Sequence, residues 1–483
     1  MIINSFSFLL FFIIVFVIYY FPLKEKTKPQ NWLLLISSYI FYGIADWRML
    51  PVLLVSTAIF YILGIKISKS TDRQASLYTT LGVVAGVGLL VYFKYLNFFI
   101  ESFANLFSSI GLQTNISTFN IIMPLGISFF TFRLISYLIE INRSKIEPTK
   151  DFVAFATYIA FFPTIMSGPI DRPNDFIPQL KSTRSFDYDL AIDGSRQVLW
   201  GLFKKMLIAD NIAGFVTLVW SDIPSQSGAT LFIAAVLYSV QMYTDFSGYS
   251  DMSIGVGKIL GFRITKNFYY PFFARNVAEF WRRWHISLTS WVTDYVFMPL
   301  NVKFRNLDNL GLIMAIIINM VIIGIWHGAN WTFAVFGLYH GLLFIPLIIS
   351  GSFARKKKLK ANKFGLPYMN DLIKMLFTFL LVTIGLVIFR AENIAQAWQY
   401  LIGIVNPVGF LSLTTDGLRA LIPTLLCTIA MFAFEWIQRN KEYPLQLDTI
   451  IPSKFMRIAL FWLIIIVTVL YSGEEQEFIY FQF

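Results

Sequence analysis

Apolar runs close to membrane-crossing length recur along this chain and limit the folds open to it. A helix needs roughly 20 apolar residues to cross a hydrocarbon core of about 30 Å. The runs that we expect to span a membrane are Ile3–Phe21, Trp32–Phe41, Met49–Ile65, Leu77–Phe93, Ile121–Ile141, Leu310–Trp326, Trp331–Ser350, Leu372–Phe389, Leu421–Trp436 and Ile458–Tyr471. The sequence therefore predicts an all-α integral membrane protein, one bundle of about ten or more helices.

Composition excludes the other broad classes of protein. Hydrophobic residues make up 57% of the 483 positions and charged residues only 14%, whereas soluble domains carry about a quarter charged residues. The single cysteine, Cys427, lies inside an apolar run, so an intrachain disulfide and a cysteine metal cluster are excluded. The net charge of +11 comes from basic residues in short loops, where they set membrane orientation, and we expect no nucleic-acid partner.

The basic loops predict how the helices cross the membrane. Lys24, Lys26 and Lys28 directly follow the first run, so the positive-inside rule places this loop in the cytoplasm and the N-terminus outside. The first run has no basic residue before it and no small-residue cleavage pattern after it, so we expect a permanent span and not a signal peptide. Arg355–Lys363 is the most basic loop and is also predicted to be cytoplasmic.

Two segments depart from simple spans. In Leu96–Leu112, Glu101, Asn105 and Ser108 follow helical spacing, which predicts a helix lying in the outer membrane interface. Phe152–Leu300 is interrupted by Pro and Gly residues and by mixed Asp, Arg and Trp. Irregular backbone at membrane depth needs protein or a water-filled cavity around it, so we expect broken or re-entrant helices lining a cavity.

His327 is the first candidate for chemistry. It lies in the segment Ile325–Trp331, between two strongly apolar runs, and an ionisable residue at membrane depth marks a functional site by default. A neutral imidazole can act as a general base near pH 7. Gly328 would allow a substrate or backbone to approach, and Asn330 could donate its amide to an oxyanion. The alternative is a structural histidine hydrogen-bonded between helices.

The other two histidines, His285 and His340, lie in the same stretch of 56 residues. On a continuous helix His340 would face away from His327 and would serve only packing. A zinc site of the three histidines is conceivable. However, the sequence has neither an HExxH spacing nor a carboxylate three or four residues from any of them, so we expect no metal.

A basic aromatic segment, Phe280–His285, is a second candidate site. On a helix Glu279 pairs with Arg275 and Arg283 at four-residue spacing, which leaves Arg282 to meet an anion. A phosphate-bearing donor is one such anion, since a guanidinium binds phosphate bidentately. The alternative is a helix at the cytoplasmic edge with belt aromatics and lipid-facing arginines.

A third candidate is the segment Tyr243–Asp251, which places two carboxylates among apolar residues. Asp245, Ser247 and Asp251 could orient a histidine or bind a substrate hydroxyl. Buried acids need partners, so the two aspartates could equally be structural clamps paired with Arg275, Arg282 or Arg283. A glycoside hydrolase is disfavoured because both acids would have to flank a sugar in water.

Several motifs, in this order along nearly the whole chain, resemble those of the membrane-bound O-acyltransferase family, and specifically its bacterial alginate O-acetylation branch. They are Met123–Phe132, Ser167–Ile170, Gly201–Lys205 with Ala209–Asn211, Asp245–Met252, Trp281–Ser287, Trp326–Trp331 and the chain end Phe478–Phe483. Any one of these motifs alone would be weakly specific, whereas the ordered set is highly specific.

The resemblance implies about 11 transmembrane helices, with re-entrant and interfacial helices, around a funnel or tunnel. We expect a single domain over 1–483, with N-terminal helices in 1–150, a catalytic core in 151–350 and C-terminal helices in 351–483. His327 matches the catalytic histidine of the family, and His285 matches a second recurrent histidine with a positioning or donor-binding role. Thr293 and Asn301 depart from the family pattern, where arginine and glycine are usual, at the expected cytoplasmic mouth.

The resemblance therefore implies an O-acetyltransferase in a bacterial cytoplasmic membrane. It would use cytoplasmic acetyl-CoA and no bound cofactor, and would acetylate an exported cell-envelope polysaccharide, such as alginate or peptidoglycan, with a periplasmic acyltransferase partner that has a Ser, His and Asp site. Trp281, Trp326, Asn330 and the Tyr243–Asp251 segment would contact substrate. The alternatives are D-alanyl transfer from a carrier protein to teichoic acid, a lipid or polymer transporter with histidine proton relays, and an inactive scaffold.

Overall fold

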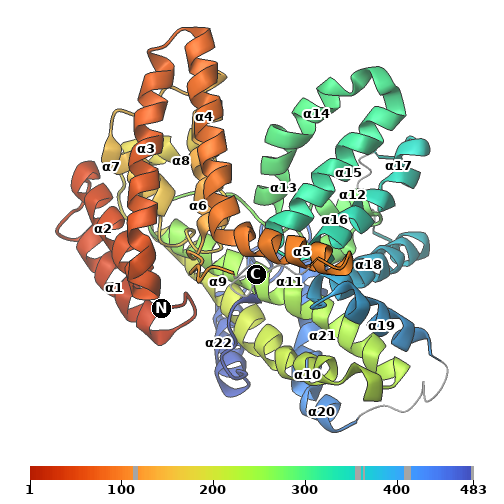
Figure 1. Ribbon diagram of the computed structural model, residues 1–483. Helices are drawn as coiled ribbons and strands as arrows, with labels where there is room; N and C mark the ends of the chain where they lie inside the picture. The colour runs from red at the N-terminus through yellow and green to blue at the C-terminus, as the bar shows by residue number, and fades with distance from the viewer. Residues whose placement is uncertain (113–117, 354–360, 363–364, 407–414, 480–483) are drawn as a thin grey trace. The chain divides into compact units, whose positions relative to one another are not determined.

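The computed structural model describes residues 1–112, 118–353, 361–362, 365–406 and 415–479, and these residues are almost entirely helical (Figure 1). Within them no strand forms, and Ala361 and Pro367 make one isolated bridge. This confirms the all-α prediction. Most of the basic loop Arg355–Lys363 and the last four residues of the chain lie outside the described residues.

The chain divides into two compact units. The first comprises Met1–Ser195 with Ser253–Thr265, and the second comprises Arg196–Met252 with Lys266–Phe483. The helices of the first unit are α1 (Phe6–Tyr20), α2 (Thr27–Asp46), α3 (Leu50–Ser68), α4 (Asp72–Leu90), α5 (Leu96–Ser109), α6 (Ile127–Asn142), α7 (Phe152–Ala160) and α8 (Pro173–Lys181).

A buried arginine organises the non-helical segment that follows α7 in the first unit. Arg133 on α6 is 0% exposed, and its guanidinium donates to the carbonyls of Tyr158, Ile159 and Pro169 and to Thr164 Oγ1 at 2.6–3.2 Å. The backbone carbonyls that no helix satisfies here thus find a partner inside the protein, as irregular backbone at membrane depth requires.

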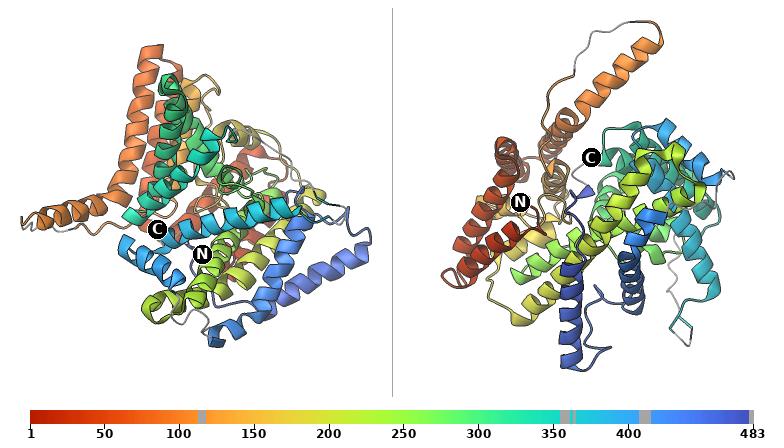
Figure 2. Two further views of the ribbon diagram at one scale, coloured as in Figure 1. Left: turned by 90° about the vertical axis from the view of Figure 1, so that its right-hand side faces the viewer. Right: turned by 90° about the horizontal axis from the view of Figure 1, so that it is seen from below.

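The helix α5 follows α4 through a short π-helical turn and leaves it at a steep angle (Figures 1 and 2). None of its residues is buried, and Glu101, Asn105 and Ser108 are all exposed. The expected helix is therefore present and does not pack into its unit, while its place in the outer membrane interface stays a prediction.

The second unit carries the remaining helices. Helices α9 (Tyr188–Leu202) and α11 (Gly228–Ile259) extend through both units. The others are α10 (Asp210–Ser221), α12 (Val277–Trp281), α13 (Ile286–Val292), α14 (Met298–Lys303), α15 (Asp308–His327), α16 (Trp331–Leu343), α17 (Ile345–Ile349), α18 (Met369–Arg390), α19 (Ile394–Val405), α20 (Thr415–Ala420), α21 (Ile422–Ile437) and α22 (Lys454–Leu470).

Six segments of the described chain are long and apolar enough to cross a membrane, and α1, α19 and α21 are shorter apolar helices. The six are Thr27–Ser68, Asp72–Ser109, Gly228–Ile259, Arg305–His327, Trp331–Ile349 and Met369–Arg390. The expected spans coincide with helices, apart from residues 121–126 of Ile121–Ile141 and the break between α16 and α17 in Trp331–Ser350. The total of about 11 stays a prediction.

Three details of the sequence prediction need correction. In the region Phe152–Leu300, which was expected to consist of broken helices, the helices are interrupted before and after α11. Helix α11 itself is uninterrupted over 32 residues. Its long apolar sequence therefore keeps it helical despite the polar motif that it contains. The span expected at Ile121–Ile141 becomes helical only after Gly126, whose φ of +68° suits a glycine. The amphipathic helix α19 was not predicted.

Candidate functional site

His327 is the last residue of α15, at the point where the chain turns into α16. The two helices approach backbone to backbone, because a Cβ on Gly324 would meet the carbonyl oxygen of Phe333, and a Cβ on Gly337 would meet that of Met320. Small residues allow such close packing between membrane helices. The approach fixes the position of the α15 end that carries His327.

The turn after His327 is held by Gly328 and Asn330. A Cβ on Gly328 would collide with the ring of Phe333. The close approach that the sequence predicted at Gly328 is therefore made by the Phe333 side chain. Asn330 caps α16 by accepting from the Thr332 amide at 3.0 Å, and its Nδ2 donates to the Glu392 carbonyl at 2.7 Å. Its predicted role as an oxyanion donor stays a prediction.

Aromatic rings form the surroundings of the His327 imidazole, which is 4% exposed. The ring centroids of Trp326, Phe336 and Phe389 lie 5.0, 6.2 and 5.1 Å from that of His327. Phe336 and Phe389 also contact each other at 5.2 Å. This wall removes water from one side of the imidazole, and electrostatic interactions there are stronger than in solvent.

His285 also contacts Trp326, whose ring centroid is 5.6 Å from that of His285. His285 is fully buried, and its Nδ1 is 3.0 Å from Asn267 Oδ1. The backbone of His285 is left-handed, with φ of +45°, a strained conformation that clusters at functional sites. Burial lowers the pKa of His285 to about 3, so the imidazole is neutral at pH 7.

Asn267 links His285 to the polar segment of α11. Its Oδ1 also accepts from Ser287 Oγ at 2.9 Å, and its Nδ2 donates to Ser250 Oγ at 3.0 Å. The Tyr243–Asp251 segment thus reaches a histidine, as one reading of the sequence allowed, through Ser250 and Asn267 and not through its aspartates. No motif in the sequence had pointed to Asn267.

The prediction for His340 assumed one continuous helix from His327, and that helix does not form. The helix breaks at residues 328–330, and the two histidines lie on separate helices that both contact the Phe336 ring, at 6.2 Å from His327 and 4.7 Å from His340. His340 is buried, and its Nδ1 accepts from Trp281 Nε1 at 3.3 Å. The described residues contain no group of three or more potential ligands arranged for a metal ion.

The aspartates of α11 are paired, but with lysines and not with the arginines that we expected. Lys205 Nζ lies 2.7 Å from Asp245 Oδ1 and 2.8 Å from Asp210 Oδ1. Lys204 Nζ bonds Asp251 Oδ2 at 2.5 Å and Ser247 Oγ at 2.8 Å. The cause is the crossing of Gly201 and Gly248, where each Cβ would meet the other glycine's carbonyl oxygen, which brings both lysines beside α11.

The same ion pairs hold the C-terminal segment in the second unit. Asp245 Oδ2 accepts from the Ile479 amide at 2.9 Å, and Lys205 Nζ donates to the Gln476 carbonyl at 3.0 Å. Phe478 and Ile479 are buried. This supports the interpretation of the two aspartates as structural clamps, since Asp245 holds the backbone of the C-terminal segment. The signal available in the sequence was the pair Lys204–Lys205 within an apolar run, close to Asp210.

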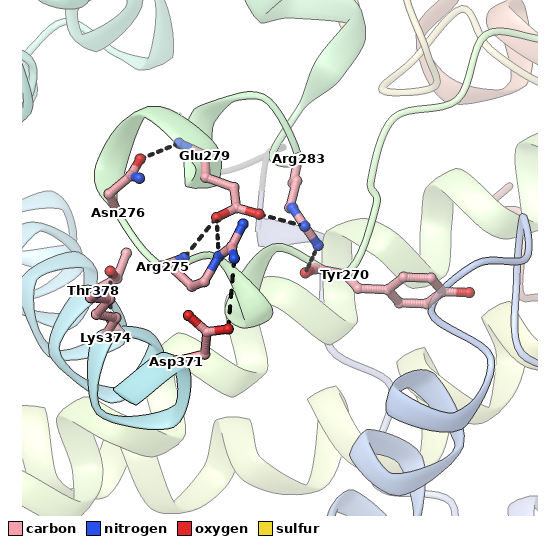
Figure 3. Close-up of polar contacts among 8 residues, drawn as sticks. All are labelled: Tyr270, Arg275, Asn276, Glu279, Arg283, Asp371, Lys374 and Thr378. Carbon is pink, nitrogen blue, oxygen red and sulfur yellow. Dashed lines mark hydrogen bonds and ion pairs between the residues drawn. The ribbon is translucent and has the colours of Figure 1, made fainter. Parts of the chain in front are cut away.

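Glu279 pairs with Arg275 and Arg283, as the helical spacing predicted (Figure 3). Its carboxylate lies 3.1 Å from Arg275 Nε and 2.6 Å from the Arg283 guanidinium, and Arg275 also approaches Asp371 at 3.7 Å. Burial would raise the pKa of Glu279, but the two arginines outweigh it and hold the pKa below its usual range. This cluster fixes the short helix α12.

Arg282 and Trp281 line a cavity of about 390 Å³ in the second unit. Its other walls are mostly hydrocarbon, from α13, α15 and residues Phe344 and Phe353, with polar atoms from Thr289, Ser290, Thr293, Asp294 and Asn319. Thr293, one of the departures from the family pattern, therefore lines this cavity. Trp281 also contacts the Phe336 ring at 6.3 Å, so aromatic rings connect the cavity wall with the wall of His327.

Comparisons with known proteins fit this arrangement. The sequence model of the MBOAT, membrane-bound O-acyltransferase family, matches residues 143–388, which include all three histidines. The chain is 37% identical over 83% of its length to "Probable alginate O-acetylase AlgI" of Pseudomonas aeruginosa, covering 74% of that protein. The protein of the same name from Pseudomonas putida is 33% identical over the full length of both chains.

A relative with a different acceptor in its name is the "Peptidoglycan O-acetyltransferase" of Helicobacter pylori. It is 32% identical over 79% of this chain, which covers 75% of that relative. The long apolar helices and the matched core agree with these relationships. The chain belongs to the membrane-bound O-acyltransferase family and is a multi-pass membrane O-acyltransferase.

Proposed function

We propose that this protein transfers an acetyl group from cytoplasmic acetyl-CoA across the membrane toward hydroxyls of an exported cell-envelope polysaccharide. The names of its relatives support acetyl transfer to a glycan. A periplasmic acyltransferase partner would act together with this protein on the polymer. The observation that carries the proposal is His327, buried at the end of a long apolar helix inside the family segment.

His327 acts as the general base. Its imidazole takes the proton from the acceptor hydroxyl while the hydroxyl oxygen attacks the thioester carbonyl carbon, forming a tetrahedral oxyanion. Asn330 or a backbone amide donates to that oxyanion. The intermediate then collapses, the carbon–sulfur bond breaks, and the departing coenzyme A thiolate receives the proton from the imidazolium. The aromatic wall keeps water from the thioester.

The cavity beside Arg282 receives the donor. Its hydrocarbon walls suit the apolar part of a thioester arm, and the Arg282 guanidinium suits the phosphates of coenzyme A. His285 acts as a positioning residue because its ring, held by Asn267, supports Trp326 beside His327. Trp281 and Trp326 form the walls along which the acyl group passes.

The proposed topology follows the basic loops. The protein lies in a bacterial cytoplasmic membrane with its N-terminus outside. Because the basic segment Arg355–Lys363, which follows the run Trp331–Ser350, is expected in the cytoplasm, the α15 end that carries His327 faces the outer side. Arg282 and the donor cavity then lie toward the cytoplasm. Acetyl-CoA is a substrate in this scheme, and no resident cofactor takes part.

Acetylation of the envelope polymer in cells carrying His327→Ala tests the proposal. We expect ester-linked acetate on the polymer to fall to background at normal protein levels, and His340→Gln, which retains an acceptor for Trp281, to keep most of it. Undiminished acetylation in His327→Ala cells would refute the assignment. Incorporation of labelled D-alanine in place of labelled acetate would identify the D-alanyl reaction, and transport without acyl transfer would identify a transporter.

A further inference from the structure

A second cavity, of about 240 Å³, lies in the second unit among α10, α11, α18, α19 and the C-terminal segment. Polar and aromatic side chains dominate its lining, among them Trp220, Tyr238, Gln241, Arg390, Gln396 and Gln476. It shares no lining residue with the cavity beside Arg282. Its volume is below the roughly 300–1,000 Å³ of sites for drug-sized ligands, so it fits one small polar unit.

Two buried polar atoms of the lining lack a hydrogen-bond partner in the part of the chain that the structure describes. They are the indole Nε1 of Trp220 and the amide Oε1 of Gln241, on side chains that are 8% and 6% exposed. An unsatisfied buried polar group costs roughly 1–3 kcal/mol. One atom is a donor and the other an acceptor, and a hydroxyl can satisfy both kinds.

Arg390 adds a fixed cationic donor to this cavity. Its guanidinium carbon lies 5.3 Å from the ring centroid of Trp220 and 5.0 Å from that of Tyr238, and one nitrogen is 3.4 Å from Thr217 Oγ1. Within the described residues no ion pair to a carboxylate is formed by Arg390. Arg390 is held between two rings and lines the cavity, so its guanidinium can donate to a ligand oxygen there.

The cavity lies at the end of α18 that contributes to the wall of His327. Phe389, whose ring is 5.1 Å from that of His327, directly precedes Arg390. Asn330, three residues after His327, donates to the carbonyl of Glu392, which also lines the cavity. A ligand in the cavity would therefore be close to the proposed general base.

The C-terminal wall of the cavity is also anchored. Gln476 and Ile479 line it, and Lys205 and Asp245 hold the Gln476 carbonyl and the Ile479 amide. Because these contacts come from buried ion pairs, the wall is preorganised and little ordering is left to oppose binding. The ion pairs of Lys205 therefore also fix the C-terminal wall of this cavity, in addition to their role in packing.

We infer that this cavity binds one sugar unit of the acceptor polysaccharide and presents its hydroxyl toward His327. A sugar ring offers vicinal hydroxyls that both donate and accept, which matches the mixed set formed by Trp220, Gln241 and Arg390. The inference rests on the proposed function, because it names the acceptor class for the same reaction.

Binding of short oligosaccharides to the full chain in nanodiscs tests the inference, measured by isothermal titration calorimetry. One arm uses a uronic-acid oligomer and the other an N-acetylhexosamine oligomer, so the arm that binds identifies the source of the sugar. We expect Gln241→Leu and Trp220→Phe each to weaken binding about five- to tenfold. Trp398→Phe on exposed α19 is the matched control, and half-exposed Gln396→Leu replaces Gln241→Leu if that variant does not fold.

His327→Ala separates this inference from the proposed function. Retained oligosaccharide binding in His327→Ala supports the cavity as the sugar site, whatever happens to acetylation. Loss of acetylation in the same variant tests only the proposed role of His327 as general base. Absence of binding in both arms, or equal binding by wild type and the Gln241→Leu and Trp220→Phe variants, would overturn the inference. Crosslinking of a photoreactive residue at position 396 to a periplasmic protein, with no oligosaccharide bound, would assign the cavity to a protein partner instead.

Discussion

Two cavities of the second unit differ in chemistry, although both adjoin residues next to the aromatic wall of His327. The cavity beside Arg282 is larger, about 390 Å³, and mostly hydrocarbon, whereas the cavity beside Arg390 is about 240 Å³ and mostly polar. Phe336 contacts Trp281 of the first cavity, and Phe389 directly precedes Arg390 of the second.

This difference follows what the reaction must bring together. A thioester arm has a long apolar part that is stabilised by hydrocarbon walls, whereas a sugar loses hydrogen bonds to water and needs replacements. One cavity could not serve both substrates well. The transfer residue then has to lie where both substrates can reach it. Helix α15, which ends at His327, lines the cavity beside Arg282, and α18, whose Phe389 contacts the His327 ring, ends at the cavity beside Arg390.

The largest expected effect comes from removing the proposed base while leaving both cavities intact. We expect His327→Gln to lower the acetyl-transfer rate by about 10²- to 10⁴-fold, the usual contribution of general base catalysis. Binding of donor and acceptor should change by less than about threefold, because neither cavity is lined by His327. The measurement is single-turnover transfer of labelled acetate alongside equilibrium binding. A variant that loses binding of both substrates in proportion to its rate would instead make His327 a structural residue.

Lys205→Met should disturb the polar cavity beside Arg390. It leaves Asp245 and Asp210 buried without their shared counter-charge, and removing one partner of a buried pair costs roughly 3–5 kcal/mol. We expect a lower thermal midpoint of the detergent-solubilised protein and weaker acceptor binding, because the Gln476 carbonyl loses its donor.

The double variant Lys205→Met with Asp245→Asn is the control for charge. It removes one of the two uncompensated acids and should recover part of the stability. If the double variant is less stable than the single variant by the full cost of a second independent change, the ion pair is not the cause.

Arg282→Gln should weaken binding of the donor alone, which would separate the roles of the two cavities. A charge-assisted hydrogen bond contributes about 1.5–3 kcal/mol, which corresponds to roughly a 10- to 100-fold rise in KM for acetyl-CoA. We expect KM for the acceptor to stay unchanged. Arg305→Gln, at a basic position that does not line the cavity, is the matched control. An equal rise in KM for acetyl-CoA in both variants would mean that the effect comes from surface charge and not from the cavity.

Much of the fold could be predicted from the sequence, because apolar runs of membrane length become helices whatever surrounds them. The pairing of Glu279 with Arg275 and Arg283 was also predictable, since four-residue spacing places them on one face. The partners of Asp245 and Asp251 were not predictable, because they depend on Gly201 and Gly248 crossing at close range. Asn267 and Arg390 were missed for the same reason, since their roles arise from segments distant in the chain.

The smallest expected effect concerns the cluster that holds α12. The arginines keep the folded pKa of Glu279 below its unfolded value of about 4.3. Its contribution to stability is therefore present above pH 4.3 and lost as the pH falls through the folded pKa. We expect the thermal midpoint of Glu279→Gln to fall less steeply than that of wild type between about pH 5 and pH 3.

Thermal unfolding of the detergent-solubilised protein across this range is the measurement, with Glu147→Gln at an exposed position as control. The effect should be modest, about 1–3 kcal/mol, because Glu279, Arg275 and Arg283 each keep 11–17% of their side-chain surface exposed. Parallel pH profiles for wild type and Glu279→Gln would mean that the arginines hold α12 without depending on the charge of Glu279. The donor cavity would then owe its shape to packing of Trp281 and Phe280, and the cluster would matter for neither substrate.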